Sequence, residues 1–218
     1  SFAVERLQTL MYTLWQLRLT NKIPKISIYV DSPLGNNVLE IFQEFHAWHK
    51  LSHTDFAEMQ RNFKIIRSYG DTWKTIDDKQ PKIIIAGSGM VTGGRVLTYL
   101  RYMIDNPENK VLLAGFQAEG TRGRQLLEGA HEVKIMGKFV QVKAQIIHIE
   151  SLSAHADQPE LLEWLSEIKN IPEEIFLIHG EKLASDALRV KIKDQYNWHV
   201  SLPKLMETRS IKFLAEKR

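Results

Sequence analysis

Hydrophobic residues recur along the first part of the chain with two different spacings. Leu7, Met11 and Leu14 lie three or four positions apart, which predicts an amphipathic helix over residues 4–21. Residues 25–31, KISIYVD, instead form a β-branched run that is typical of a strand. A second helical pattern follows the turn SPLG, so the chain starts in the order helix, strand, helix.

Two later apolar runs are short, continuous and closed by glycine. Residues 82–87 read KIIIAG and residues 110–115 read KVLLAG, and each leads toward a helical stretch, as the central strands of a parallel sheet do. Residues 131–150 differ, because they alternate around Gly137 and predict a hairpin or two consecutive strands. The pattern therefore predicts an α/β fold with a parallel sheet, followed by a domain boundary in the hairpin region.

Beyond the hairpin, the pattern predicts two more helices and one more strand. Residues 160–168, ELLEWLSEI, and a segment from near Glu181 have helical spacing, whereas residues 175–180, IFLIHG, indicate a buried strand. Four tryptophans lie in or beside apolar patterns, and we expect them in the core rather than as platforms that stack on bases. They are Trp15, Trp48, Trp164 and Trp198.

Composition and charge exclude several classes of protein. The 218 residues are 44% apolar, enough for one sizeable core or two modest ones, and the net charge of +3 permits binding to a polyanion without arguing for it. The absence of cysteine excludes disulfides, thiolate zinc sites and cysteine nucleophiles. No apolar run approaches the roughly 18 residues of a membrane span, so we expect a cytoplasmic protein with no membrane partner.

Residues 151–165, SLSAHADQPELLEWL, place Ser153, His155 and Asp157 between a strand and a helix. Asp157, followed three positions later by Glu160, is typical of a helix N-cap, but this interpretation explains Asp157 alone. A histidine just before a helix N-terminus is unusual as mere filling, because the positive helix end disfavours its charged form. On residue types alone, a functional and a structural role for His155 therefore stay equally open.

A second histidine, His179, ends the apolar run of residues 175–180 just before a predicted helix. Strand ends that feed loops are where open α/β sheets present ligand groups, so His155 and His179 could converge at one sheet edge. The alternative is a core imidazole that is hydrogen-bonded to a carbonyl group. Residue types alone favour the core imidazole.

The glycine-rich stretch AGSGMVTGGR has part of a phosphate-loop pattern. Gly89 and Gly94 have the spacing of a P-loop, but Arg95 stands where a lysine is required, and Thr92 breaks the dinucleotide-binding pattern. A turn whose backbone N–H groups face a helix start can still cradle a phosphate of a polymer backbone. Gly89 and Thr92 are therefore candidate phosphate-binding residues, and a tight strand-to-helix turn is the equal alternative.

Two arginines, Arg122 and Arg124, lie near the start of another predicted helix, in GFQAEGTRGRQLLEGA. Paired guanidinium groups at this position suit a phosphodiester. A solvated helix face is the simpler explanation of the same two residues. Both interpretations stay open at the level of sequence.

Two other chemistries are discounted. The cluster of His46, His49 and His53 contains the spacing of a metalloprotease helix, but Lys50 stands where the catalytic glutamate is required, so we do not expect a zinc site there. The serines beside His155 are not expected to be nucleophiles, because their surroundings lack a nucleophile elbow.

Six segments occur in the same order as the signature segments of a known family: SFAVERLQTLMYTL, IYVDSPLG, AGSGMVTGGR, GFQAEGTRGRQLLEGA, SLSAHAD and FLIHGE. On these segments the chain resembles the β-CASP nucleases, which are metallo-β-lactamase-fold enzymes. The resemblance covers essentially the whole chain. It implies an α/β fold, with a β-CASP domain of parallel-sheet arrangement at residues 1–143. The C-terminal strands and helices of a metallo-β-lactamase domain are then expected at residues 144–218.

The resemblance also implies roles for the residues of the two histidine motifs. His155, in SAHAD, resembles the family's general acid toward the leaving oxygen, and Asp157 is suited to hold its tautomer. His179, in HGE, resembles a ligand of the second zinc ion and favours RNA over DNA as the substrate. Ser153 and the backbone at Ala154 are suited to hold a phosphate beside these groups.

The family's upstream metal-binding motif, HxHxDH, does not occur in the chain. We therefore expect a piece of a two-zinc ribonuclease that acts on single-stranded RNA, with this chain alone inactive and without retained zinc. The start at Ser1, already in a helical pattern, favours a processed product or a piece of a longer protein. A noncatalytic RNA-binding subunit is the main alternative, a DNA-processing β-CASP nuclease is a lesser one, and a homodimer is left open. A nucleotide-binding α/β domain is discounted, because the phosphate-loop patterns are broken.

Overall fold

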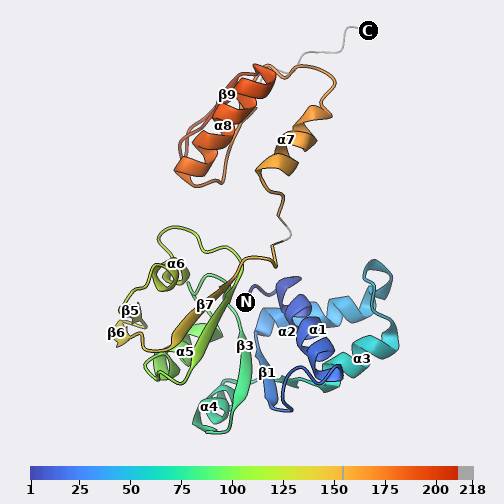
Figure 1. The fold of residues 1–218 in the computed structure, drawn as a ribbon, viewed down its shortest axis with the longest axis vertical. Coiled ribbons are helices and arrows are strands. Elements are labelled where there is room, and N and C mark those ends of the chain that lie inside the picture. Colours follow the sequence, from blue (N-terminus) through green and yellow to red (C-terminus); the bar gives the residue numbers. More distant parts are fainter. Residues whose placement is uncertain (154, 211–218) are drawn as a thin grey trace. The chain divides into compact units, whose positions relative to one another are not determined.

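The computed structural model describes residues 1–153 and 155–210, and the chain divides into two compact units (Figure 1). Unit 1 is Ser1–Ser153 and unit 2 is Ala154–Arg218. Within the described residues, no helix is both long and apolar enough to cross a membrane.

The first part of unit 1 is built on a three-stranded parallel sheet. Its order is β2-β1-β3, with β1 at Ser27–Asp31, β2 at Lys64–Ile65 and β3 at Lys82–Ala86. The register places Asp31 opposite Ala86, so β1 and β3 end at the same edge of the sheet. The predicted parallel pairing is confirmed, but the centre of this sheet is β1 rather than the KIIIAG strand β3.

Four α-helices and one 3-10 helix accompany these strands. They are α1 (Arg6–Leu19), α2 (Pro33–Glu44), η1 (His46–Trp48), α3 (His53–Arg61) and α4 (Tyr69–Asp77). Helices α2, α3 and α4 each follow a serine, Ser32, Ser52 or Ser68, whose hydroxyl oxygen accepts a hydrogen bond from a first-turn N–H group. The apolar faces of α1, α2 and α3 pack with β1 and β3 in the first core cluster, which lies where these elements adjoin in Figure 1.

The second part of unit 1 contains two more strand pairs. β4 (Lys110–Ala114) pairs in parallel with β7 (Gln145–Ile149), and β5 (Glu132–Ile135) pairs in antiparallel fashion with β6 (Lys138–Gln141). Between β5 and β6, Met136 and Gly137 have φ values of 48° and 80°. Two consecutive positive φ angles make a tight hairpin turn and favour glycine. The predicted hairpin around Gly137 is therefore confirmed.

Helices α5 (Arg95–Met103) and α6 (Arg122–Leu127) share a second core cluster with β4, β5 and β6. Strand β7 joins this part through its ladder with β4, and unit 1 consequently extends to Ser153. The division between the compact units thus falls later in the chain than the boundary expected between residues 143 and 144.

Unit 2 consists of two helices and a short pair of parallel strands. The helices are α7 (Gln158–Ser166) and α8 (Lys182–Tyr196), and β8 (Ile175–Phe176) pairs with β9 (Val200–Ser201). Leu165 and Ile192 are the buried hydrophobic residues in the described part of unit 2. The prediction of a buried strand over residues 175–180 is wrong. Strand β8 is short and half-buried, and Ile178 beyond it is 75% exposed.

The four tryptophans differ in their environment. Trp15 is 3% exposed in the first core cluster, as predicted, and Trp198 is half-buried. The core prediction is wrong for Trp48 and Trp164, which are 87% and 69% exposed. Trp48 lies in η1, after α2 has ended, so the helical pattern that predicted its burial no longer applies. In α7 the neighbouring Leu165 occupies the buried position instead.

Candidate functional site

Helix α7 begins with reciprocal hydrogen bonds between Asp157 and Glu160. Asp157 Oδ1 accepts from the backbone N–H of Glu160 at 2.9 Å, and the backbone N–H of Asp157 donates to Glu160 Oε2 at 2.9 Å. This capping box satisfies N–H groups that the first helical turn leaves free, and the predicted N-cap is confirmed. It also fixes the course of the chain just after His155.

His155 lies on the segment that leads into this cap. Ser153, His155 and Asp157 are all exposed, while Ala154 lies outside the described residues. Asp157 Oδ1 serves the helix cap. A second role for this carboxylate, in holding the tautomer of His155, therefore stays a prediction.

His179 lies between β8 and α8 and is exposed. Its φ of 67° is in the left-handed region, which residues other than glycine rarely adopt. At the next position, Gly180, a Cβ atom would lie 2.2 Å from Ser185 Oγ, so a larger residue there would displace the Ser185 hydroxyl. The alternative of a core imidazole is therefore wrong. The structure leaves the His179 side chain accessible to a ligand.

The described residues do not form a complete metal centre. Among them, no group of three or more His, Cys, Asp or Glu side chains is arranged to hold a metal ion. A zinc site takes three or four protein ligands, of which His179 supplies at most one. The described chain by itself thus does not fit a zinc ion.

Gln117, which is 2% exposed, holds the loops after β3 and β4 together. Its Nε2 donates to the carbonyl oxygens of Gly89 at 2.9 Å and Gly115 at 3.0 Å. The backbone N–H of Gly123 also donates to Met90 O at 3.1 Å. Sequence reasoning missed Gln117, because its partner Gly89 lies 28 positions away and no local pattern marks the contact.

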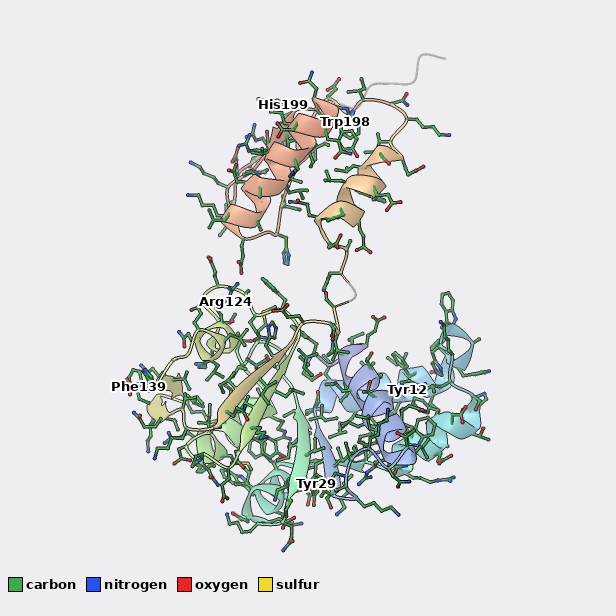
Figure 2. All side chains as sticks on the ribbon, viewed as in Figure 1. Tyr12, Tyr29, Arg124, Phe139, Trp198 and His199 are labelled. Carbon is green, nitrogen blue, oxygen red and sulfur yellow. The ribbon has the colours of Figure 1, made fainter. Side chains whose placement is uncertain are left out.

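Arg122 and Arg124 bind carbonyl groups of the protein itself. Arg122 donates from Nε to a carbonyl of β5 at 2.5 Å and from Nη1 to Thr92 O at 3.5 Å. Arg124 Nε donates to Gln117 O at 2.8 Å (Figure 2). Both arginines are half-buried, so a solvated helix face is wrong as their explanation. The structure brings these residues and the Gly89 loop together, whereas their binding of phosphate stays a prediction.

A buried ionic network at the end of β1 was not predicted. Asp31 is 0% exposed, and its Oδ2 accepts from Thr72 Oγ1 at 2.6 Å and from Tyr99 OH at 2.8 Å. Arg95 Nε lies 3.3 Å from Asp31 Oδ1, and its guanidinium lies 4.0 Å from the centroid of the Tyr69 ring. Burial, with the hydrogen bond to Asp31, raises the pKa of Tyr99 well above its usual range. Arg95, which stands at the P-loop lysine position, is thus paired with Asp31 inside the protein.

His49 is hydrogen-bonded through both of its ring nitrogens. Its Nε2 lies 2.8 Å from Phe42 O, and its Nδ1 accepts from the backbone N–H of Leu51 at 3.2 Å. Because Nδ1 accepts, Nε2 carries the proton and donates, which leaves neither nitrogen for a metal ion. The rings of His46 and His53 lie 3.8 Å apart between centroids. The contacts of His46, His49 and His53 therefore join η1 to α2 and α3.

Two family models match the chain. The Beta-Casp domain matches residues 7–126, and the Zn-dependent metallo-hydrolase RNA specificity domain matches residues 140–203. The first match spans the elements from α1 to α6. The second contains both histidine motifs and the described helices and strands of unit 2.

Several curated proteins are similar to the chain. Ribonuclease TTHA0252 from Thermus thermophilus is 29% identical over 188 residues, or 84% of this chain and 42% of that protein. The RNase J-like protein from Methanocaldococcus jannaschii is 32% identical over 188 residues, or 84% of this chain and 42% of that protein. Transcription termination factor FttA from Methanothermobacter thermautotrophicus is 29% identical over 224 residues, or 95% of this chain and 34% of that protein.

The chain spans less than half the length of these relatives. The Beta-Casp match nevertheless covers more than half of the chain, and the RNA specificity match covers most of what remains. Parallel strands alternate with helices in unit 1, as the hydrophobic pattern predicted. The chain therefore belongs to the β-CASP family of metallo-β-lactamase-fold nucleases.

Proposed function

We propose that the chain is part of a zinc-dependent ribonuclease that hydrolyses phosphodiester bonds in single-stranded RNA in the cytoplasm. The observation that carries this proposal is the match of residues 140–203, with both histidine motifs, to the Zn-dependent metallo-hydrolase RNA specificity domain. Relatives named ribonuclease and RNase J-like support the same chemistry. In this proposal the chain supplies RNA binding, the general acid and one metal ligand.

The general acid is assigned to His155. Cleavage of a P–O bond leaves an oxygen that needs a proton, and imidazole can carry a transferable proton near neutral pH. His155 is exposed, on a segment whose direction is fixed by the capping box of α7, so a substrate can reach it while the helix stays intact.

His179 is assigned as a ligand whose partner ligands lie outside this chain. Its accessible imidazole is in a unit with many exposed large hydrophobic side chains, and such a surface favours burial against further protein. These side chains are Trp164, Ile168, Ile171, Ile178, Leu183, Val190, Leu205 and Met206. We accordingly assign residues 144–218 as the C-terminal part of a metallo-β-lactamase domain that is completed by other parts of the whole protein.

Phosphate binding is assigned to the loops of unit 1 and to Ser153. Gly89 and Thr92 lie on the loop after β3, and Arg122 and Arg124 lie at the start of α6. Each arginine donates from Nε to a backbone carbonyl, which fixes the orientation of its guanidinium plane. Oriented guanidinium groups beside backbone N–H groups suit the phosphates of an RNA chain.

The test uses the whole protein with His155→Ala, His179→Ala and the control His199→Ala. His199 is an exposed histidine of the same unit, with Nδ1 3.5 Å from Glu174 Oε1 (Figure 2). His155→Ala should lower RNA cleavage by about 10²–10⁴-fold at unchanged zinc content, since a general acid contributes that much. His179→Ala should lower both cleavage and zinc content, and His199→Ala should change neither. Equal zinc loss in the first two variants contradicts the assigned roles.

Two further measurements separate the proposal from its alternatives. Elemental mass spectrometry of this chain alone should give a zinc content near zero, because the proposed site is completed from outside the chain. One or more tightly held ions per chain would contradict that division of the site. If the whole protein binds single-stranded RNA without cutting it, a noncatalytic RNA-binding subunit replaces the proposal.

A further inference from the structure

A pocket of about 370 Å³ lies in unit 1 between α2, α3 and β2. Leu39, Ala57 and Ile65 form its apolar wall. The volume is in the range of pockets that hold small molecules. The residues that line this pocket lie outside the glycine-rich loops and the histidine motifs, so the pocket is separate from the site proposed above.

Two exposed arginines, Arg61 and Arg67, line this pocket. In residues 1–153 and 155–210, neither side chain makes a hydrogen bond or an ion pair. By contrast, Arg18, Arg95 and Arg122 of the same unit each bind a carbonyl or carboxylate group. Planar guanidinium groups without protein partners suit an anion, and phosphate above all, because two N–H groups match two of its oxygens.

Hydrogen-bond acceptors line the same pocket. Asn36 Nδ2 donates to Ile66 O at 3.0 Å, which fixes the amide and leaves Asn36 Oδ1 without a partner in the described chain. Glu40 is exposed, and its carboxylate forms no ion pair with any described residue, the two pocket arginines included. A ligand that carries both an anionic group and N–H donors therefore complements the pocket better than a simple anion does.

A guanine nucleotide has this combination of groups. The N1–H and N2 amino groups of guanine are neighbouring donors that match one carboxylate, and adenine, cytosine and uracil lack such a pair. The faces of the base can cover the apolar wall, and the phosphate supplies the anion. We propose that this pocket binds a guanine nucleotide, with its phosphate on Arg61 and Arg67 and its base edge on Glu40. The proposal does not rest on the proposed nuclease function.

The test is equilibrium binding of GMP, AMP and inorganic phosphate to the intact protein. Arg61→Gln and Arg67→Gln should each weaken GMP binding by at least about tenfold, because each removes a charge-assisted hydrogen bond. Glu40→Gln should remove the preference for GMP over AMP, since only guanine uses the carboxylate. Arg101→Gln, on α5 outside the pocket, is the matched control and should leave GMP binding unchanged.

Each outcome of this test decides the proposal. GMP binding that is unchanged in both arginine variants overturns it, and so does phosphate binding as tight as GMP binding, which would mark a simple anion site. The oligonucleotides UUGUU and UUUUU distinguish the two sources of the ligand. Tighter binding of UUGUU than of GMP, lost in Arg61→Gln, identifies a guanosine within RNA. Binding of GMP at least as tight as that of UUGUU identifies the free nucleotide.

Discussion

Unit 1 and unit 2 bury their hydrophobic residues to very different extents. Unit 1 contains three core clusters, and buried hydrogen bonds connect its strand ends and loops. In the described part of unit 2, Leu165 and Ile192 are the buried hydrophobic residues, while side chains as large as Trp164 and Leu183 are exposed. Unit 1 therefore carries its stability in its own packing. Unit 2, which contains His155 and His179, has far less buried apolar packing of its own.

In unit 2, the local signals that define the ends of a helix are present without the apolar packing that stabilises a helix. Helix α7 starts at a capping box, and α8 ends at Asn197, whose left-handed φ of 54° is typical of a helix C-terminus. These local signals define the helices of unit 2 even though little apolar surface packs behind them. Most of the stability of a helix in a protein comes from such packing. The helices of the two units are thus equally regular, but those of unit 2 have less apolar packing to stabilise them.

The largest effect is expected from Arg95→Met in unit 1. Loss of the guanidinium leaves the buried Asp31 carboxylate without its ion pair, which typically costs about 3–5 kcal/mol. Denaturant unfolding should show this loss of unfolding free energy. Arg101→Met, on the same helix, is the control, and it should change stability by less than about 0.5 kcal/mol. A small effect of Arg95→Met would mean that Thr72 and Tyr99 alone satisfy Asp31.

A direct comparison of the units uses the same change, leucine to alanine, in each of them. Leu126→Ala, at a 1% exposed position of the second core cluster, should lower the unfolding free energy by about 2–5 kcal/mol. Leu183→Ala, at an 83% exposed position of α8, should change it by less than about 0.5 kcal/mol in this chain. Thermal and denaturant unfolding of both variants measures the contrast. Similar losses at the two positions would refute the difference in core support.

Hydrogen exchange tests the same contrast without mutation. Backbone amides of β1 and β3 should exchange at least about 100-fold more slowly than those of α8, because α8 opens without disrupting a core cluster. Mass spectrometry of peptides from the exchanged chain gives both rates. Equal protection of the two regions would show that unit 2 is stable without any cover.

The smallest effect is expected from Asp157→Ala. Removal of the cap acceptor should lower the stability of α7 by about 1 kcal/mol, since one first-turn N–H loses its partner. Faster amide exchange confined to α7 would report this loss. Asp157→Asn is the matched variant, because it keeps a cap acceptor and should retain most of the stability. Equal exchange of α7 in the two variants would argue against the cap as the cause.

Features governed by neighbouring residues could be predicted from the sequence. The hairpin around Gly137 and the Asp157 cap depend on turn and cap chemistry within a few positions, and both are confirmed. The burial of Trp48 and Trp164 was predicted wrongly, because it depends on where α2 ends and on which face of α7 is covered. Periodicity marks an apolar face, but it does not say whether another element covers that face.

Features that depend on distant pairing could not be predicted. Tyr99 and Asp31 lie 68 positions apart, and nothing local to either one indicates the other. For Arg95, the P-loop pattern showed only that it stands where a lysine is required. Its ion-pair partner, Asp31, was found only in the structure. The candidate site divides in the same way. The sequence motifs identified His155 and His179, whereas the role of Gln117 in holding two loops required the structure.

The Gln117 contact has a consequence for which sequences this fold can tolerate. Its amide places two N–H donors against two carbonyl oxygens, and a Cβ atom at Gly123 would lie 1.6 Å from its Oε1. Glutamate has the same shape, but its ionised form would set a negative charge against both carbonyl groups. Any side chain at position 123 would displace the amide. A change at either position would therefore weaken the link between the loop after β3 and the loop after β4.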